Sequence, residues 1–306
     1  MTRVLFVGVL IVFGWADCFS QSMKVTLLGT GSPPPVMDRF GPSVLVEAGN
    51  QKLIFDVGRG SLQRLTQAAV KPRDITAVFF THLHSDHLVG FPDLWLTGWV
   101  NGRREKPVRA FGPAGTVRLM ARLEEAFDFD IKIRLYDDRP PPEGIHIEAK
   151  DIVEGLVYDT DGVRVTAFDV DHEPIKPAFG FRIDFAGRSV IISGDTKYSE
   201  NLIKFAKGVD LLIHEVVSLD SLRRANYSDE RVRTIINHHT SPEQAGELFT
   251  KVKPKMAVYY HLVLPSAVES DLITRTRTKY NGPLEIGHDL MVMEVGEQVT
   301  VKKASQ

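Results

Sequence analysis

The sequence has little of three features that would narrow a search for function: cysteine, clustered charge and repeats. Its single cysteine is Cys18, so a mature chain that starts near Gln21 would have no disulfide and no thiolate metal ligand. The formal net charge is -2 and the basic residues are not clustered, so nothing indicates a surface for nucleic acid. We therefore expect no nucleic-acid partner. No internal repeat or low-complexity tract appears, in agreement with one large domain.

The chain also lacks an apolar run long enough to cross a bilayer. Val4–Phe13 is too short to span one, and it follows Arg3, as in a secretory signal peptide. Cys18-Phe19-Ser20 offers small residues before a cleavage point. We expect residues 1–20 to be removed and residues 21–306 to form a periplasmic or secreted hydrolase domain with no stable membrane span. A buried N-terminal strand and an uncleaved anchor are the alternatives.

Predicted strands and helices alternate along the chain in two similar halves. The first half has strands near residues 24–28, 43–48, 52–56 and 77–80 and helices near 90–100 and 115–127. The second half has strands near 163–168, 179–185, 189–193 and 211–214, helices near 200–207, 242–251 and 267–279, and closing strands at 290–294 and 298–301. The Pro-rich stretch 137–144 is interpreted as the connection between the halves. This order predicts an α+β fold of two mixed sheets, face to face, with helices outside.

Four side chains that can bind metal lie within six residues: His82, His84, Asp86 and His87. They directly follow the apolar segment 77–80, so the motif lies where a strand ends. In an extended chain His82 and His84 point to the same side, while Asp86 and His87 fall where the chain turns. Imidazole and carboxylate ligands are typical of zinc, and the two pairs predict two metals.

The remaining ligands are expected at the ends of other strands, far away in sequence. His172, Asp195 and His261 each follow an apolar strand, and Gly194 permits a tight turn before Asp195. Asp56 also ends a strand, and we expect it to orient a ligand histidine rather than to bind metal. Their common position at strand ends is the arrangement that a shared cleft requires.

The pattern resembles the metallo-beta-lactamase superfamily and, within it, the branch that contains tRNase Z and the zinc-dependent arylsulfatases. The matching segments cover nearly the whole mature chain: Leu28–Pro33, Asp56, His82–His87, His172, Phe179–Ile183, Gly194–Thr196, His214–Glu215, His239–Ser241 and His261. The resemblance implies the four-layer αββα sandwich of this superfamily. It also implies two zinc ions per chain. One would be held by His82, His84, His172 and Asp195, and the other by Asp86, His87, Asp195 and His261.

The resemblance assigns catalytic roles as well. Two such metals lower the pKa of a water that bridges them, so that hydroxide can attack an ester. Asp86 would accept or orient the proton of that water, His239 would protonate the leaving oxygen, and Glu215 would orient His239. The alternative for His239 is a residue that only precedes a helix, with Ser241 as N-cap and Pro242 at the first helical position.

Two motif residues and one short interval disfavour some reactions of this superfamily. Asp195 stands where one subclass of beta-lactamases has a thiolate, and His84 stands where the iron-binding oxidoreductases usually have Glu. Only residues 184–192 fill the interval in which bacterial tRNase Z carries its tRNA-gripping arm. We therefore interpret the chain as a zinc hydrolase of small anionic esters, either aryl sulfates or phosphodiesters. The alternatives are a tRNase Z-like endoribonuclease that processes the 3' end of tRNA, and a lactonase. The oligomeric state is left open, a homodimer included.

Two further segments each allow two interpretations. Trp95 and Trp99, on the helix after the metal motif, could line an aryl pocket or pack in the core. Residues 216–237 form a long polar segment that carries four arginines. This segment is either a lid that supplies an anion-binding arginine or a solvated surface loop.

Overall fold

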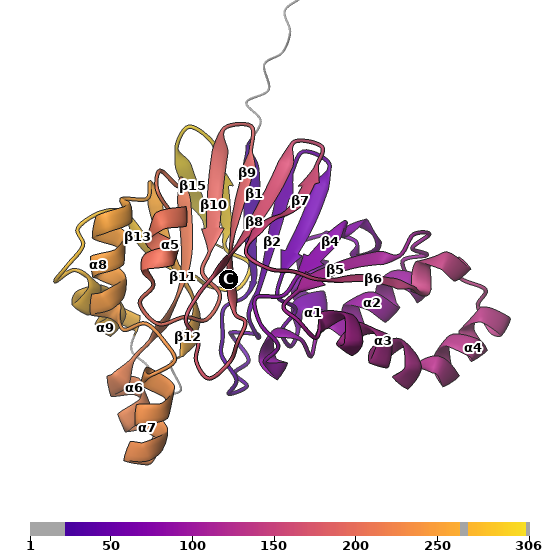
Figure 1. Ribbon diagram of the computed structural model, residues 1–306, viewed down its shortest axis with the longest axis horizontal. Helices are drawn as coiled ribbons and strands as arrows, with labels where there is room; N and C mark the ends of the chain where they lie inside the picture. The colour runs from indigo at the N-terminus through magenta and orange to yellow at the C-terminus, as the bar shows by residue number, and fades with distance from the viewer. Residues whose placement is uncertain (1–21, 264–268, 304–306) are drawn as a thin grey trace, which may run out of the picture.

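The computed structural model describes residues 22–263 and 269–303 and consists of two sheets packed face to face (Figure 1). The predicted signal peptide, with Cys18, lies outside the described residues. The first sheet has the strand order β15-β14-β1-β2-β3-β4-β5-β6. Its strands are β1 (Met23–Gly29), β2 (Ser43–Ala48), β3 (Gln51–Phe55), β4 (Ala77–Phe79), β5 (Val108–Gly112), β6 (Ile147–Asp151), β14 (Val292–Val295) and β15 (Val299–Lys302).

The second sheet has the strand order β13-β12-β11-β10-β9-β8-β7. Its strands are β7 (Gly155–Thr160), β8 (Val163–Asp169), β9 (Phe179–Phe185), β10 (Arg188–Ile192), β11 (Leu211–Val217), β12 (Met256–Val263) and β13 (Leu284–Ile286). Both sheets mix parallel and antiparallel pairs, as predicted.

Helices cover the outer face of each sheet, so the predicted four-layer αββα sandwich is confirmed (Figure 1). On the side of the first sheet lie α1 (Ser61–Gln67), α2 (Phe91–Val100), α3 (Thr116–Ala126) and α4 (Asp128–Asp137). On the side of the second sheet lie α5 (Glu200–Phe205), α8 (Pro242–Val252) and α9 (Glu269–Thr276). Two short helices, α6 (Leu219–Arg224) and α7 (Asp229–Ile236), project beyond the sandwich near the end of β12. Three 3₁₀ turns complete the list: Pro72–Asp74, Ser85–His87 and Pro142–Ile145.

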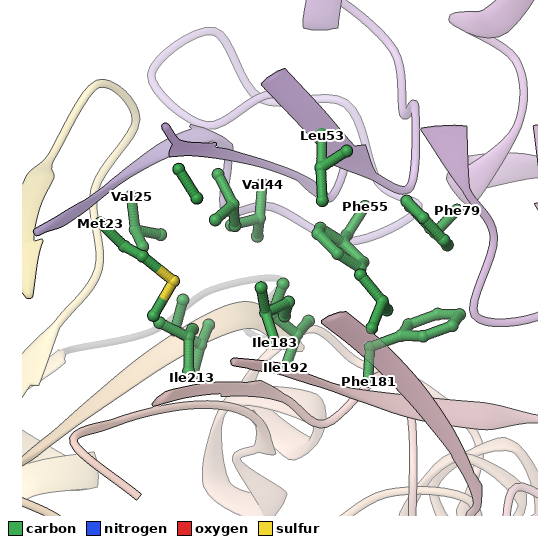
Figure 2. Packing of buried hydrophobic residues seen from close by; sticks show 14 of the residues in the cluster. Met23, Val25, Val44, Leu53, Phe55, Phe79, Phe181, Ile183, Ile192 and Ile213 are labelled. Carbon is green, nitrogen blue, oxygen red and sulfur yellow. The ribbon is translucent and has the colours of Figure 1, made fainter. Parts of the chain in front are cut away.

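The main core lies between the two sheets (Figure 2). Along β9, Phe181 and Ile183 face this core two residues apart, as the period of a strand requires. Phe79 of the first sheet stacks on Phe55 with ring centroids 4.9 Å apart, and Phe181 of the second sheet meets it edge-on at 5.7 Å. These aromatic contacts hold the two sheets together directly beneath the ends of β3 and β4.

Trp95 and Trp99 belong to the core rather than to a substrate pocket. Both are fully buried between α2 and the first sheet. Each indole N–H donates to a backbone carbonyl, that of Trp95 to Ile145 at 2.6 Å and that of Trp99 to Pro141 at 2.8 Å. Since neither ring lines the pocket described below, the core interpretation of the two tryptophans is correct.

The path between the two sheets differs from the prediction. The chain passes from β6 to β7 at residues 152–154, after the Pro-rich stretch 137–144, which lies within the first half. The stretch breaks the end of α4 and leads into β6, because its prolines cannot continue a helix. None of the helices in the described part of the chain is long and apolar enough to cross a membrane.

Candidate metal centre

Loops at one end of both sheets carry the residues of the metal motif. The motif begins after β4 and turns through the 3₁₀ segment Ser85–His87. Gly194, after β10, has a φ of 62°, and a Cβ there would lie 2.5 Å from the carbonyl oxygen of Phe179. Only glycine fits this turn, which brings Asp195 to the site. The amide of Phe179 in turn donates to the carbonyl of Thr81 at 2.9 Å, which joins the second sheet to the motif of the first.

A β-bulge re-aims the residues at the end of β12. Between β11 and β12 the register shifts, so that Tyr260 and His261 on β12 lie opposite Glu215 alone on β11. His261 has a backbone φ of 41°, which is uncommon for residues other than glycine and costs free energy. An extra residue in one strand turns the neighbouring side chains away from the alternating pattern. Here it directs both His261 and Glu215 toward the cleft.

The first group of candidate ligands consists of His82, His84, His172 and Asp195. Nδ1 of His84 lies 2.9 Å from Nε2 of His82 and 3.4 Å from Nε2 of His172. Oδ2 of Asp195 lies 3.9 Å from Nε2 of His82 and 3.8 Å from Nε2 of His172. The four atoms therefore surround one point.

The second group consists of Asp86, His87 and His261. Oδ2 of Asp86 lies 3.6 Å from Nε2 of His87 and 3.4 Å from Nε2 of His261. The same Oδ2 of Asp195 that faces the first group lies 3.4 Å from both of these imidazole nitrogens. One carboxylate therefore stands between the two groups, and the structure brings all seven predicted ligands together.

The donor set fits metal ions. Two ligands at about 2.1 Å from a tetrahedral ion lie about 3.4 Å from each other, close to the distances found in both groups. Nε2 of His87 and Oδ1 of Asp195 are buried and have no hydrogen-bond partner among the described residues. Buried polar atoms without a partner are costly unless an ion or water satisfies them. A cation at each group would do so.

Residues around the ligands fix which imidazole nitrogen faces the centre. Oδ2 of Asp56 lies 2.7 Å from Nδ1 of His87 and accepts from the Thr81 hydroxyl at 2.8 Å. Nδ1 of His172 donates to the carbonyl of His238 at 2.9 Å. Each bond leaves the lone pair of Nε2 directed at the candidate ion, as outer partners of metal ligands do. Asp56 thus contacts a candidate ligand from outside the cluster, as the sequence analysis predicts, and is not itself among the candidate ligands.

The electrostatics of the cluster suit a cation. Burial lowers the pKa of His82, His84 and His172, so these imidazoles are neutral and offer a lone pair. Burial would also lower the pKa of His87, but the carboxylates of Asp195 and Asp56 raise it well above its usual range. The carboxylates thus favour positive charge at this point, which a bound metal would supply.

Asp86 is the carboxylate of the cluster that faces the pocket. Burial opposes its ionisation, yet a hydrogen bond from His261 and the nearby His87 lower the pKa of Asp86 to about 2. It is therefore ionised at neutral pH and can accept a proton or a hydrogen bond there.

His239 lies beside the cluster and is oriented by Glu215. Its Nδ1 is 3.4 Å from Oε1 of Glu215, which is fully buried and also accepts from the amide of Thr240 at 2.9 Å. Burial would lower the pKa of His239, but Glu215 raises it above its usual value. The helix-start interpretation of this segment is correct, because Ser241 is the N-cap of α8 and makes a capping box with Gln244. His239 also lies within metal-binding range of Asp195 and His261.

A pocket of about 280 Å³ opens onto the cluster. One wall holds His84, Asp86, His172, Asp195, His239 and His261. The opposite wall comes from the helices α6 and α7 and the loop after β1, with Leu222, Ile235, Pro33 and Pro34 among its apolar members. Most of residues 216–237 thus form α6 and α7, and five of them line the pocket, which supports the lid interpretation of this segment.

Comparison with known proteins adds the family. Residues 43–262 match the family described as beta-lactamase superfamily domain. The chain belongs to this superfamily. It is 37% identical to Ribonuclease Z of Mycolicibacterium gilvum over 92% of this chain and 99% of that protein. It is 36% identical to Ribonuclease Z of Mycobacterium marinum over 89% of this chain and 99% of that protein.

Solved structures of the superfamily share the fold. The metallo-beta-lactamase fold protein YhfI from Bacillus subtilis superposes with a TM-score of 0.69 at 19% identity, over 89% of this chain and 99% of that one. The short form of human tRNase Z superposes with a TM-score of 0.66 at 24% identity, over 88% of this chain and 98% of that one. The chain is a metallo-beta-lactamase superfamily hydrolase with a histidine and aspartate cluster of the kind that holds metal ions.

The expectation that nucleic acid is not a partner is wrong. Relatives that match over almost their whole length are named Ribonuclease Z, a name for enzymes that act on RNA. The expectation failed because net charge is a sum over the chain and does not report where single cations lie. The short hairpin of β9 and β10 is not decisive either. The Mycolicibacterium gilvum relative is covered to 99% by this chain and so has no room for a large additional arm.

Proposed function

We propose that this protein is a metal-dependent phosphodiesterase that cleaves RNA in the manner of ribonuclease Z. The observation that carries this proposal is the likeness to enzymes named Ribonuclease Z over 92% of the chain. The convergence of all seven predicted ligands on one cleft supports it, since a partner protein without catalysis would not need such a cluster. Phosphodiesters are also one of the two classes of small anionic ester that the sequence predicts as substrates.

Two zinc ions per chain are the proposed cofactors. The distances support one ion among His82, His84, His172 and Asp195, and another among Asp86, His87, Asp195 and His261. When bound, such a pair activates water and neutralises charge on the phosphoryl oxygens.

The residues around the cluster would move the protons. Asp86 lines the pocket, and its carboxylate would accept or orient the proton of the attacking water. His239 would donate a proton to the leaving oxygen of the ribose, and Glu215 would hold its ring through Nδ1. Asp56 and Thr81 would keep the ligands His82 and His87 in the tautomer that binds metal.

Small aryl esters form a second candidate class of substrate. The apolar wall with Pro33, Pro34 and Leu222 would suit an aryl group, and the cavity is small. Aryl sulfates, aryl phosphodiesters and lactones would all use the same metal cluster, so geometry alone does not separate them from RNA.

One substrate panel tests the proposal. Zinc-loaded protein is assayed on a 3'-extended tRNA precursor, bis(4-nitrophenyl) phosphate, 4-nitrophenyl sulfate and an aromatic lactone, with Asp195→Ala as the inactive control. We expect cleavage of the RNA at a kcat/KM above that for every small ester. A preference for the sulfate or the lactone, with RNA left intact, would overturn the proposal and favour the second class.

We also propose that residues 1–20 direct export of the protein. Arg3 and the short apolar run Val4–Phe13 support this. N-terminal sequencing of protein recovered from periplasmic and cytoplasmic fractions tests it. An intact Met1 on protein confined to the cytoplasmic fraction would contradict it.

A further inference from the structure

The helices α6 and α7 form a small unit with apolar contacts of its own, here called the lid (residues 218–236). Its buried members Leu222 and Val232 pack with Val217 and Val263, at the ends of β11 and β12, in a cluster separate from the three larger ones. Both helices begin at a serine N-cap, Ser218 and Ser228. Figure 1 shows the lid projecting beyond the sandwich. It can therefore place side chains over the metal cluster without being part of either sheet.

One arginine of the lid lies on the pocket. Arg231, on the first turn of α7, lines the same cavity as His84, Asp86 and His239. Its guanidinium carbon lies 4.2 Å from the ring centroid of Tyr227, which also lines the cavity. A ring face attracts the cation and holds it in place, yet it provides no carboxylate to neutralise the charge.

The other three arginines of the segment are arranged differently. Arg224 is paired with Asp271 at 3.0 Å, outside the pocket. Arg223 and Arg233 are exposed, as Arg231 is, but they do not line the cavity. The ion pairs found within residues 22–263 and 269–303 do not include Arg231. Of these four cations, Arg231 is the one that faces the metal cluster with its charge uncompensated.

We propose that Arg231 binds a second phosphate of the substrate, next along the RNA strand to the phosphate at the metal cluster, and that Tyr227 positions it. This inference rests on the proposed function and deepens it. Arg231 and the candidate ligands line one pocket, so one ligand with two phosphates can reach both the cluster and Arg231. Arginine suits this role because its planar fork binds phosphate through two parallel hydrogen bonds. The favoured ligand is thus a chain of nucleotides rather than an ester with a single charge.

A binding experiment tests the assignment without depending on turnover. Calorimetry on zinc-loaded protein compares uridine 3',5'-bisphosphate with uridine 5'-monophosphate. The wild type should bind the bisphosphate at least about 10-fold more tightly, as expected for one additional charge-assisted contact. Arg231→Gln should lose this advantage. Arg233→Gln, which removes the same charge from the same helix outside the pocket, should keep it.

Salt dependence gives an independent readout. For a short oligoribonucleotide, the logarithm of the association constant falls linearly with the logarithm of the salt concentration. The steepness of this line should decrease by about 0.7 in Arg231→Gln, the value for one phosphate contact on a single strand. It should be unchanged in Arg233→Gln. Tyr227→Phe should behave as wild type, because the ring is kept, whereas Tyr227→Ala should weaken bisphosphate binding and leave monophosphate binding unchanged.

The outcomes separate this inference from the proposed function. If the wild type leaves RNA intact but Arg231→Gln alone loses the bisphosphate advantage, the phosphate subsite stands and the RNA proposal fails. If the wild type cleaves RNA while Arg231→Gln keeps the bisphosphate advantage, the subsite is refuted. An equal loss in Arg231→Gln and Arg233→Gln would also refute it, since the effect would then be one of general charge.

Discussion

The metal cluster and the lid face each other across one pocket, yet they depend on different parts of the chain. The cluster takes ligands from His82 to His261, held by the ends of strands from both sheets and by buried partners such as Asp56. The lid is local in sequence and packs through a cluster of four buried residues, two of which are its own and two of which end β11 and β12. From this comparison we expect the sandwich to fix the position of the ligands, and the lid to be the part in which substitutions alter substrate choice without disturbing them.

The strongest test of the rigid side is Asp195→Ala. Because Oδ2 of Asp195 lies between the two groups of ligands, its removal should reduce metal content from about two ions to fewer than one. Activity should fall at least about 10³-fold, since stabilisation worth several kcal/mol is lost. Metal analysis by plasma emission and single-turnover rates measure both effects. The control Asp159→Ala removes an exposed carboxylate of β7. A variant that kept two ions would mean that Asp195 is not shared.

His239→Ala tests a residue on the border between the two regions. As a proton donor to a leaving oxygen, it should cost about 10²-fold for an ester with a poor leaving group and much less for a nitrophenyl ester. Metal content should be unchanged. The rates are compared across a series of leaving groups, with exposed His146→Ala as control. Loss of zinc in the variant would instead identify His239 as a ligand, in the third grouping with Asp195 and His261.

Asp56→Asn tests how much the residues that contact the candidate ligands contribute to metal affinity. The amide is a weaker acceptor for Nδ1 of His87 and for the Thr81 hydroxyl, so zinc affinity should fall about 10- to 100-fold. Competition with a chelator measures this affinity. An unchanged affinity together with reduced thermal stability would show that Asp56 supports the fold alone.

The smallest effect is expected for Leu222→Ala in the lid, measured against a buried leucine of the sandwich. Leu202→Ala, in the core between the second sheet and its helices, should lower the free energy of unfolding by about 2–5 kcal/mol. Leu222→Ala, in the lid, should lower it by about 1 kcal/mol or less, because the lid can open locally while the sandwich stays folded. Urea titration gives both values, and hydrogen exchange at the lid amides should rise in the second variant. Equal losses would mean that lid and sandwich unfold together.

The two-sheet sandwich is also the part of the molecule whose structure could be predicted best from the sequence. Strands β2 and β9 begin and end where the apolar pattern predicted, and the ligands follow strand ends, because burial imposes periodicity. The helix α4 was missed since none of its residues is fully buried, and Phe129 is 81% exposed. The short helices of the lid were missed for a similar reason. Their polar sequence resembles a loop, and only the serine N-caps marked them.

Within the site, the details that escaped sequence analysis are those made by the backbone. The bulge that aims His261 and Glu215 depends on a register shift between two strands distant in sequence. The hydrogen bond from His172 to the carbonyl of His238 uses a group that every residue has. Arg231 is one of four arginines in its segment, and only its place on the pocket and its contact with Tyr227 distinguish it. No pattern of residue types encodes these features.

Because candidate ligands from both sheets meet at one site, a metal ion bound there would cross-link the two sheets. Each group of candidate ligands combines residues that follow β4 of the first sheet with residues from the second sheet, namely His172, Asp195 or His261. A chain with one cysteine cannot join its two halves by an internal disulfide, but a bound ion can do so reversibly. At a free metal concentration 1,000 times the dissociation constant, an ion that binds only the folded state adds about 4.1 kcal/mol of stability. The stability of the folded protein would therefore rise and fall with the concentration of the metal that binds here.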